Sequence, residues 1–321
     1  MEIHLKINLS SNRKSGTLKR MPDFFNYIDN YIEHLFNEGR YSCFRNTKAF
    51  RRNLSQFVEG KSIDIRNISA QFIDDFRHFL SFSIGNSHNT IVEKLKVFSL
   101  LIDGYCAEYK VLSYHNPFDD YKISRKQTQR AFLTKEEIEI IMSLHLKENS
   151  NMALSRELFY IECFTGLRIS DILCLKWNNY TGDSLSLTIR KTGQHISIPL
   201  THRVKKIIES HRSLFSGGND YIFPVLPIDV DCSSSIDSSK AIASATTLID
   251  THIKKIALRA GLSKKVTSHT GRHSFASMLI EEGATIFDIK ELLGHQDVRV
   301  TQVYTHMVDV RKKNVMKMLD Y

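Results

Sequence analysis

A break in the hydrophobic pattern between residues 113 and 132 divides this 321-residue chain into two parts. The break contains a proline and many cations, and its apolar residues follow no regular period. Such a segment is typical of a connection between domains, and the length suffices for two domains. The sequence therefore predicts a helical domain at 21–113, a basic linker at 114–132 and a second domain at 133–321. The polar residues 1–20 are expected to form a flexible arm.

The part before the break has the periodicity of amphipathic helices. Phe24, Ile28, Tyr31 and Leu35 recur every three or four residues, which places them on one face of a helix. Similar stripes predict three further helices, near residues 50–57, 69–80 and 90–108, and Ser69 can cap the helix at 69–80. We therefore expect a small all-helical domain with basic outer faces.

The part after the break mixes helices with one hairpin. Thr134 and Glu137 form a capping box, and a helix at 155–164 is expected to end at Gly166. Residues 184–189 and 195–200 alternate as two strands of a β-hairpin around a Lys-Thr-Gly turn. Residues 225–247, rich in serine and aspartate, are expected to form a loop, with helices resuming near Leu248. The fold class is thus mainly α with a small antiparallel sheet.

Charge and cysteine content narrow the choice of binding partner and cellular compartment. The formal net charge of +9 favours a polyanionic partner, nucleic acid first and an anionic membrane second, although a merely basic soluble protein fits nearly as well. No apolar run approaches the roughly 20 residues of a membrane span, and the start does not resemble a secretory signal. The five scattered cysteines, without a CxxC pair, are expected to be reduced thiols of a cytosolic protein.

Six residues suited to phosphate chemistry follow one another in the second part. Guanidinium groups bind pairs of phosphate oxygens and stay charged, so they can stabilise charge that develops on phosphorus-bound oxygens. A tyrosine can attack phosphorus if a base or a cationic site helps its phenol, with a pKa near 10, to ionise. Taken singly, an arginine is more typical of a surface ion pair and a tyrosine of a core position. A solvated turn fits the lysine equally well, and a helix C-cap is a rival interpretation for the second histidine. The six are Arg168, Lys191, His269, Arg272, His295 and Tyr304.

In order and in local context, this set resembles the catalytic signature of the tyrosine recombinase (phage integrase) family. The contexts TGLRISDIL, IRKTGQ, HTGRHSFAS, LLGHQDV and TQVYTH carry the resemblance, which covers about residues 130 to 310 and extends more loosely into the N-terminal third. It implies an N-terminal helical core-binding (SAM-like) domain and an α+β tyrosine-recombinase catalytic domain with a C-terminal tail helix. It further implies site-specific DNA recombination (integration, excision or inversion) without metal, cofactor or ATP.

The resemblance also implies a role for each residue. Tyr304 is the nucleophile that forms a 3′-phosphotyrosyl intermediate, and His269 can take its proton. Lys191 protonates the leaving 5′ oxygen, with Arg190 as a competing candidate. Arg168, Arg272 and His295 hold the scissile phosphate. Asp171 could brace an active-site arginine or histidine, although a plain aspartate in a first helical turn is equally consistent.

The implied partner is double-stranded DNA. The family places a homo-tetramer on paired sites, with a monomer or weak oligomer before DNA binds, and allows for an accessory directionality factor. The tail is hypothesised to dock on a neighbouring protomer. The setting would be the cytoplasm of a bacterium or its phage, associated with the nucleoid. The residues expected to contact DNA are Arg45, Lys48, Arg51, Arg52, Lys94, Lys122, Arg125, Lys126, Arg130 and Arg190.

Three other classes of function remain open. A type IB topoisomerase or a telomere resolvase uses the same residue types, and a non-catalytic DNA-binding regulator would keep only the binding. A metal-dependent relaxase would need a histidine triad.

One departure from the family pattern is Gly271, where a bulky apolar residue usually precedes the arginine. A glycine there is expected to loosen helix packing, at a cost of about 1 kcal/mol relative to alanine.

Overall fold

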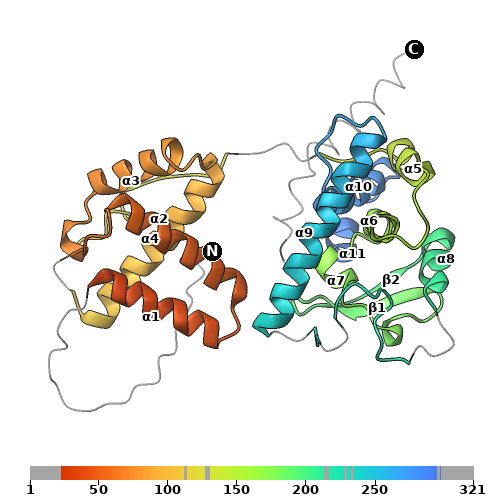
Figure 1. Cartoon of the computed structure of the whole chain (residues 1–321), viewed down its shortest axis with the longest axis horizontal. Helices are drawn as coiled ribbons and strands as arrows, with labels where there is room; N and C mark the ends of the chain where they lie inside the picture. The colour runs from red at the N-terminus through yellow and green to blue at the C-terminus, as the bar shows by residue number, and fades with distance from the viewer. Residues whose placement is uncertain are drawn as a thin grey trace. The chain divides into compact units, whose positions relative to one another are not determined.

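The computed structural model describes residues 23–111, 114–126, 131–212, 217–227, 230–232, 235–294 and 297. The chain forms two compact units, Met1–Gln127 and Thr128–Tyr321, drawn in Figure 1 from red to yellow and from green to blue. Over the described ranges they contain helices and one two-stranded sheet. None of the helices within those ranges is both long and apolar enough to cross a membrane.

The first unit is a bundle of four helices, which confirms the all-helical prediction. They are α1 (Phe24–Asn37), α2 (Tyr41–Phe57), α3 (Ala70–Phe82) and α4 (His88–Tyr109), with a 3₁₀ turn at Ile65–Asn67. Aromatic rings fill the core: Phe50 packs edge-on against Phe76 at 5.9 Å between ring centroids, and its ring is tilted against that of Phe98 at 5.2 Å. Such pairs add to the stabilisation that burial alone provides. The predicted cap is present, since the Ser69 side chain accepts a hydrogen bond from the Phe72 N–H.

Residues 114–126 pack on this first unit, although the sequence predicted a linker from residue 114. The hydroxyl of Tyr114 donates to the carbonyl of Ile68 at 2.8 Å, and Phe118 and Tyr121 lie against the aromatic core. These apolar residues anchor an extended segment, so they lack the helical period that would have revealed their burial. Residues 127–130 lie outside the described residues.

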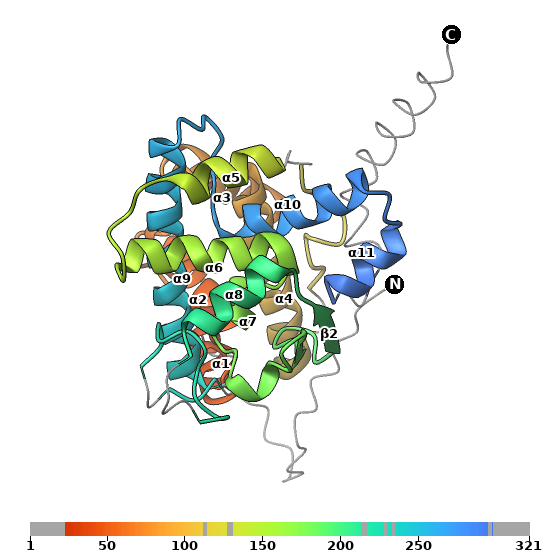
Figure 2. The same ribbon diagram turned by 90° about the vertical axis from the view of Figure 1, so that its right-hand side faces the viewer.

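The second unit is built around one central helix, α6 (Asn151–Thr165), which Figure 2 shows among its neighbours. It packs against α10 (Ser268–Glu281) and α9 (Ile236–Arg259), and α5 (Lys135–Ser143) and α8 (His202–Ser210) also contact it. Burial on several sides explains why α6 is largely apolar. The remaining elements are α7 (Ile169–Ile172), a 3₁₀ turn (Trp177–Asn179) and α11 (Ile286–Leu292). The predicted capping box of Thr134 and Glu137 opens α5.

The predicted hairpin is present as β1 (Ser184–Thr188) and β2 (His195–Pro199), paired antiparallel. In this register Leu187 lies opposite Ile196, and both are buried. The alternating apolar residues therefore face the core, and the turn at residues 190–192 projects from the strands.

The prediction of a loop at 225–247 is wrong from Ile236 onward, where α9 begins. Ser235 caps this helix by accepting from the Ser238 N–H at 3.1 Å. The hydroxyls of Thr246 and Thr247 donate to carbonyls four residues earlier, at 2.8 and 2.9 Å. Because these hydroxyls are satisfied inside the helix, a serine- and threonine-rich sequence remains helical. Its buried stripe contains Ile242, Ile249, Ile253 and Ile256.

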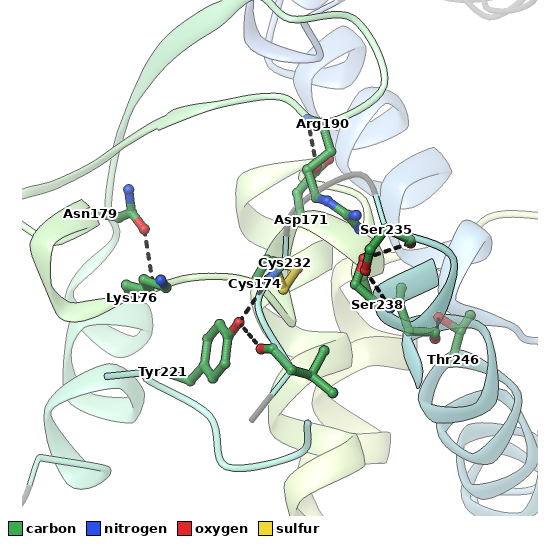
Figure 3. The surroundings of a disulfide bond; sticks show 12 residues. Asp171, Cys174, Lys176, Asn179, Arg190, Tyr221, Cys232, Ser235, Ser238 and Thr246 are labelled. Atoms are coloured by element: carbon green, nitrogen blue, oxygen red, sulfur yellow. Dashed lines mark hydrogen bonds between the residues drawn. A yellow bond between two sulfur atoms is a disulfide. The ribbon is translucent and has the colours of Figure 1, made fainter. Parts of the chain in front are cut away.

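The expectation that all five cysteines are reduced is also wrong. Cys174, which follows α7, forms a disulfide with Cys232, which precedes α9 (Figure 3). The Tyr221 hydroxyl helps to hold this loop, because it donates to the Val230 carbonyl and accepts from the Cys232 N–H. The two cysteines are 58 positions apart, so no local motif marks the pair. The free thiols are Cys43, Cys106 and Cys163.

Candidate active site

The turn between α6 and α7 positions Arg168. The central helix ends at Gly166, whose left-handed backbone (φ 65°) lets its N–H bond the Glu162 carbonyl at 2.9 Å. Glycine is required there for a second reason: a β-carbon would lie 2.4 Å from the Phe275 Cδ1 atom. Arg168 then occupies the N-cap position of α7, with 16% of its side chain exposed. A mostly enclosed arginine is thus fixed by backbone geometry at a tight turn.

Helix α10 brings Arg272 to the same turn. Arg272 is only 6% exposed. Its Nη1 atom donates to the Gly166 carbonyl at 2.5 Å, and its Nη2 atom donates to the Leu293 carbonyl at 2.6 Å. Both bonds are charge-assisted, so they orient the planar guanidinium strongly. The structure therefore joins α10, the α6–α7 turn and the end of α11 through one side chain.

Asp171 connects Arg168 to the hairpin. Its carboxyl is 2% exposed; Oδ1 accepts from the Arg190 N–H at 3.1 Å, and Oδ2 lies 4.0 Å from Arg168 Nη1. Oδ2 has no hydrogen-bond partner among the described residues. Burial raises the pKa of Asp171, and the Arg190 N–H and the Arg168 charge oppose that rise. Asp171 thus lies in the first turn of α7 with its carboxyl near Arg168, so a role in bracing that arginine stays a prediction.

The hairpin presents Arg190 and Lys191 at its turn, where both side chains are exposed. The Arg190 N–H donates to the Asp171 carboxyl, as Figure 3 shows, so the hairpin turn is fixed to α7. The base of the hairpin also meets the end of α11, since a β-carbon at Gly294 would lie 3.1 Å from Ile189 Cγ1. A pocket of about 180 Å³ opens beside Asp171 and Arg190 and reaches the disulfide.

His269 lies one turn before Arg272 on α10 and is exposed, whereas Arg272 is buried. The start of this helix is fixed by Asp250, whose carboxylate accepts from the Ser268 N–H at 2.7 Å. Gly294 follows α11 with a left-handed backbone, which is typical of a glycine at a helix end. His295 and Tyr304 lie outside the described residues. The structure thus groups Arg168, Asp171 and Arg272, and places the elements that carry Lys191 and His269 around them.

The sequence interpretation missed Glu162, a carboxyl close enough to Arg272 to feel its charge. It is fully buried on α6. Burial raises its pKa well above the usual range, an effect that the charge of Arg272 opposes and that of Asp250 reinforces. The available signal was a lone acid within the otherwise apolar run Phe159–Phe164. Buried acids are rare enough that this one needs a physical explanation.

The cations expected to contact DNA differ in their surroundings. Arg51 forms a double hydrogen bond with Asp29, and Arg125 pairs with Glu93 at 2.7 Å. Lys94 is half-buried and donates to Asn53; burial, followed by the charge of Arg52, lowers its pKa. Arg130 lies outside the described residues. The side chains that are exposed are those of Arg45, Lys48, Arg52, Lys122, Arg125, Lys126 and Arg190.

Comparisons with known proteins assign a family to each of the two units. The sequence model of the Phage integrase family matches residues 131–311, and that of the Phage integrase SAM-like domain matches residues 23–123. The chain is 25% identical to a tyrosine recombinase of Thermosipho africanus over 306 residues, which cover 91% of this chain and 99% of that protein. It is 31% identical to tyrosine recombinase XerC of Xanthomonas axonopodis pv. citri over 153 residues, 47% of this chain and 45% of XerC.

Among solved structures, the XerH site-specific recombinase bound to a palindromic difH substrate in a post-cleavage complex shares this fold. Its TM-score is 0.69 at 16% identity, over 96% of this chain and all of that one. The fold and the order of the site residues therefore both match those of the phage integrase family.

Proposed function

Because the chain belongs to the phage integrase family, we propose that it is a tyrosine recombinase that cuts and rejoins DNA at specific sites. The observation that carries this proposal is the bond from Arg272 to the carbonyl of Gly166, two residues before Arg168. It links Arg272 to the turn that carries Arg168, which supports the proposal that both guanidinium groups bind one phosphate. Electrostatic stabilisation of this type is usually the largest catalytic contribution, about 3 to 4 kcal/mol per donor.

The proposed reaction exchanges one phosphoester for another. The Tyr304 hydroxyl attacks phosphorus, the bond from phosphorus to the 5′ oxygen breaks, and a 3′-phosphotyrosyl bond forms. His269 takes the phenol proton, and Lys191 supplies a proton to the leaving 5′ oxygen. A 5′ hydroxyl of a partner duplex then attacks the phosphotyrosyl bond and releases the tyrosine. Because each step makes and breaks one phosphoester bond, the exchange needs no ATP.

The proposed partner is double-stranded DNA, as in the difH complex of XerH. The exposed cations of α2, namely Arg45, Lys48 and Arg52, are suited to phosphate contacts, which weaken as salt rises. We further propose a homo-tetramer on paired sites that forms from monomers or weak oligomers, with room for an accessory directionality factor. The tail after Tyr304 would dock on a neighbouring protomer. Crosslinking of a cysteine placed at position 318 tests this, and only intramolecular products would contradict it.

The test is a plasmid with two copies of the DNA that flanks the gene, incubated with the purified protein. Recombination would yield inverted or excised products in wild type and none in Arg272→Ala. Relaxed plasmid without exchange between the two copies would favour a topoisomerase instead. Retardation of the DNA without any change in its topology would leave only a DNA-binding regulator.

A further inference from the structure

The carboxyl of Glu162 lies where the side chain of residue 271 would otherwise be. A β-carbon added at Gly271 would stand 3.1 Å from Glu162 Oε2, 3.2 Å from Phe159 Cε2 and 3.3 Å from Cys163 Sγ. All three contacts are tighter than ordinary van der Waals packing. Helices α6 and α10 therefore approach closely at this point, directly beside the backbone that carries Arg272.

Neither carboxyl oxygen of Glu162 has a hydrogen-bond partner among the described residues. The charged and titratable groups around it are Arg272 on α10, Asp250 on α9 and Cys163 on α6. The Ile169 N–H, at the start of α7, lies close enough to favour the ionised form without a hydrogen bond to either oxygen. Glu162 thus lies between the start of α7, which follows Arg168, and the helix that carries Arg272.

Such a residue is costly to the fold. A buried polar group without a partner loses its hydration, and a well-packed apolar side chain in its place is often neutral or stabilising. A leucine has nearly the same volume and would remove the cost. Costly groups of this kind cluster at functional sites, where they serve the reaction rather than stability.

We propose that Glu162 is a positioning residue of the recombinase: its carboxyl fills the space left by Gly271 and holds Arg272 in the orientation that meets the DNA phosphate. The inference rests on the proposed function, because it assigns Arg272 to the phosphate. It also explains Gly271, since a bulky side chain at that position would displace the carboxyl. Glycine at 271 and glutamate at 162 act as a complementary pair.

The experiment compares Glu162→Leu and Glu162→Gln with wild type in single-turnover cleavage of a nicked DNA substrate. A misplaced guanidinium should slow covalent-complex formation at saturating DNA by about ten- to a hundredfold in Glu162→Leu. The Kd for DNA should stay within a factor of about two, because phosphate contacts elsewhere provide most of the affinity. The midpoint of urea unfolding should not fall. Glu162→Gln, which keeps the shape and polarity, should recover most of the rate.

The matched controls are Glu157→Leu and Glu157→Gln, on the same helix, where the carboxyl pairs with His211 at 2.9 Å instead. They should cleave at the wild-type rate. Wild-type cleavage by Glu162→Leu would overturn the proposal, and so would a slower rate that merely follows a loss of folded protein. If the wild type itself formed no covalent complex, the proposed function would fail first, whatever the Glu162 variants did.

Discussion

Arg272 Nη1 donates to the carbonyl oxygen of Gly166 at 2.5 Å, so the second arginine of the site is fixed by the backbone that leads to the first. Gly166 takes a left-handed conformation and faces Phe275 and Leu293. One turn thereby sets the positions of Arg168 and Arg272 together. A change in its backbone should disturb both guanidinium groups at once.

Gly166→Ala should therefore be strongly destabilising. The new β-carbon would lie 2.4 Å from Phe275 Cδ1 and 2.8 Å from Leu293 Cδ2. Left-handed strain and overpacking each cost about 1 to 3 kcal/mol, and urea unfolding would measure their sum. Gly261→Ala is the control, since its φ is +74° but nothing lies within 4 Å of the added carbon. Equal losses in the two variants would contradict the packing argument.

Gly271→Ala tests the close approach of α6 and α10. In an ordinary helix interior the change stabilises by about 1 kcal/mol. Here the added carbon meets Glu162, Phe159 and Cys163 at 3.1 to 3.3 Å, so we expect a net loss of about 1 kcal/mol. The loss should shrink in a Glu162→Ala background, which a double-mutant cycle of unfolding free energies would reveal. An ordinary helical gain in the wild-type background would argue against the close approach.

The pH dependence of stability should report on Glu162. Burial raises its pKa well above the usual range, so the folded protein keeps a proton that the unfolded chain releases above about pH 4.3. The unfolded state then binds fewer protons, and stability falls as pH rises through this window, by up to about 1.4 kcal/mol per pH unit. Glu162→Gln should remove that slope. Urea unfolding of both proteins between pH 5 and 7.5 measures it; parallel curves would contradict the prediction.

The disulfide between Cys174 and Cys232 should lower the number of reactive thiols in the unreduced protein. Of the five cysteines, two are paired, so five minus two leaves three reactive thiols in the denatured, unreduced protein. Closing a loop of 58 positions constrains the unfolded chain by about 4 kcal/mol in the loop-entropy account, an upper value. A reductant should thus destabilise wild type while leaving Cys232→Ser unchanged. Five reactive thiols before reduction would rule out the pair.

The sequence predicted those features that depend on residues close together in the chain. The helical stripes of the first unit, the capping box at Thr134 and the hairpin follow from patterns that span two to four residues, and the two arginines stand in recognisable motifs. Two features were predicted wrongly because the sequence lacks a regular apolar pattern there. The helix from Ile236 was hidden by hydroxyls that bond their own backbone, and the anchors in residues 114–126 have no period.

Pairs formed by distant segments could not be read from the sequence at all. Cys174 and Cys232 meet only because the chain folds back on itself, and Glu162 meets Gly271 only because α6 and α10 touch. The glycine was visible as a departure from the family pattern, and it suggested looser packing. The structure shows the opposite: the helices approach closely, and a β-carbon at 271 would lie 3.1 Å from the glutamate on the facing helix.

The most direct test of the account is a nicked suicide substrate that traps the protein on DNA, run with wild type, Tyr304→Phe and Arg272→Ala in the presence of EDTA. The account predicts a covalent protein–DNA complex through a 3′-phosphotyrosine in wild type, none with Tyr304→Phe, and a loss of at least about a hundredfold in rate with Arg272→Ala. A covalent complex that persists in Tyr304→Phe, or one that forms only with a divalent ion, would contradict it.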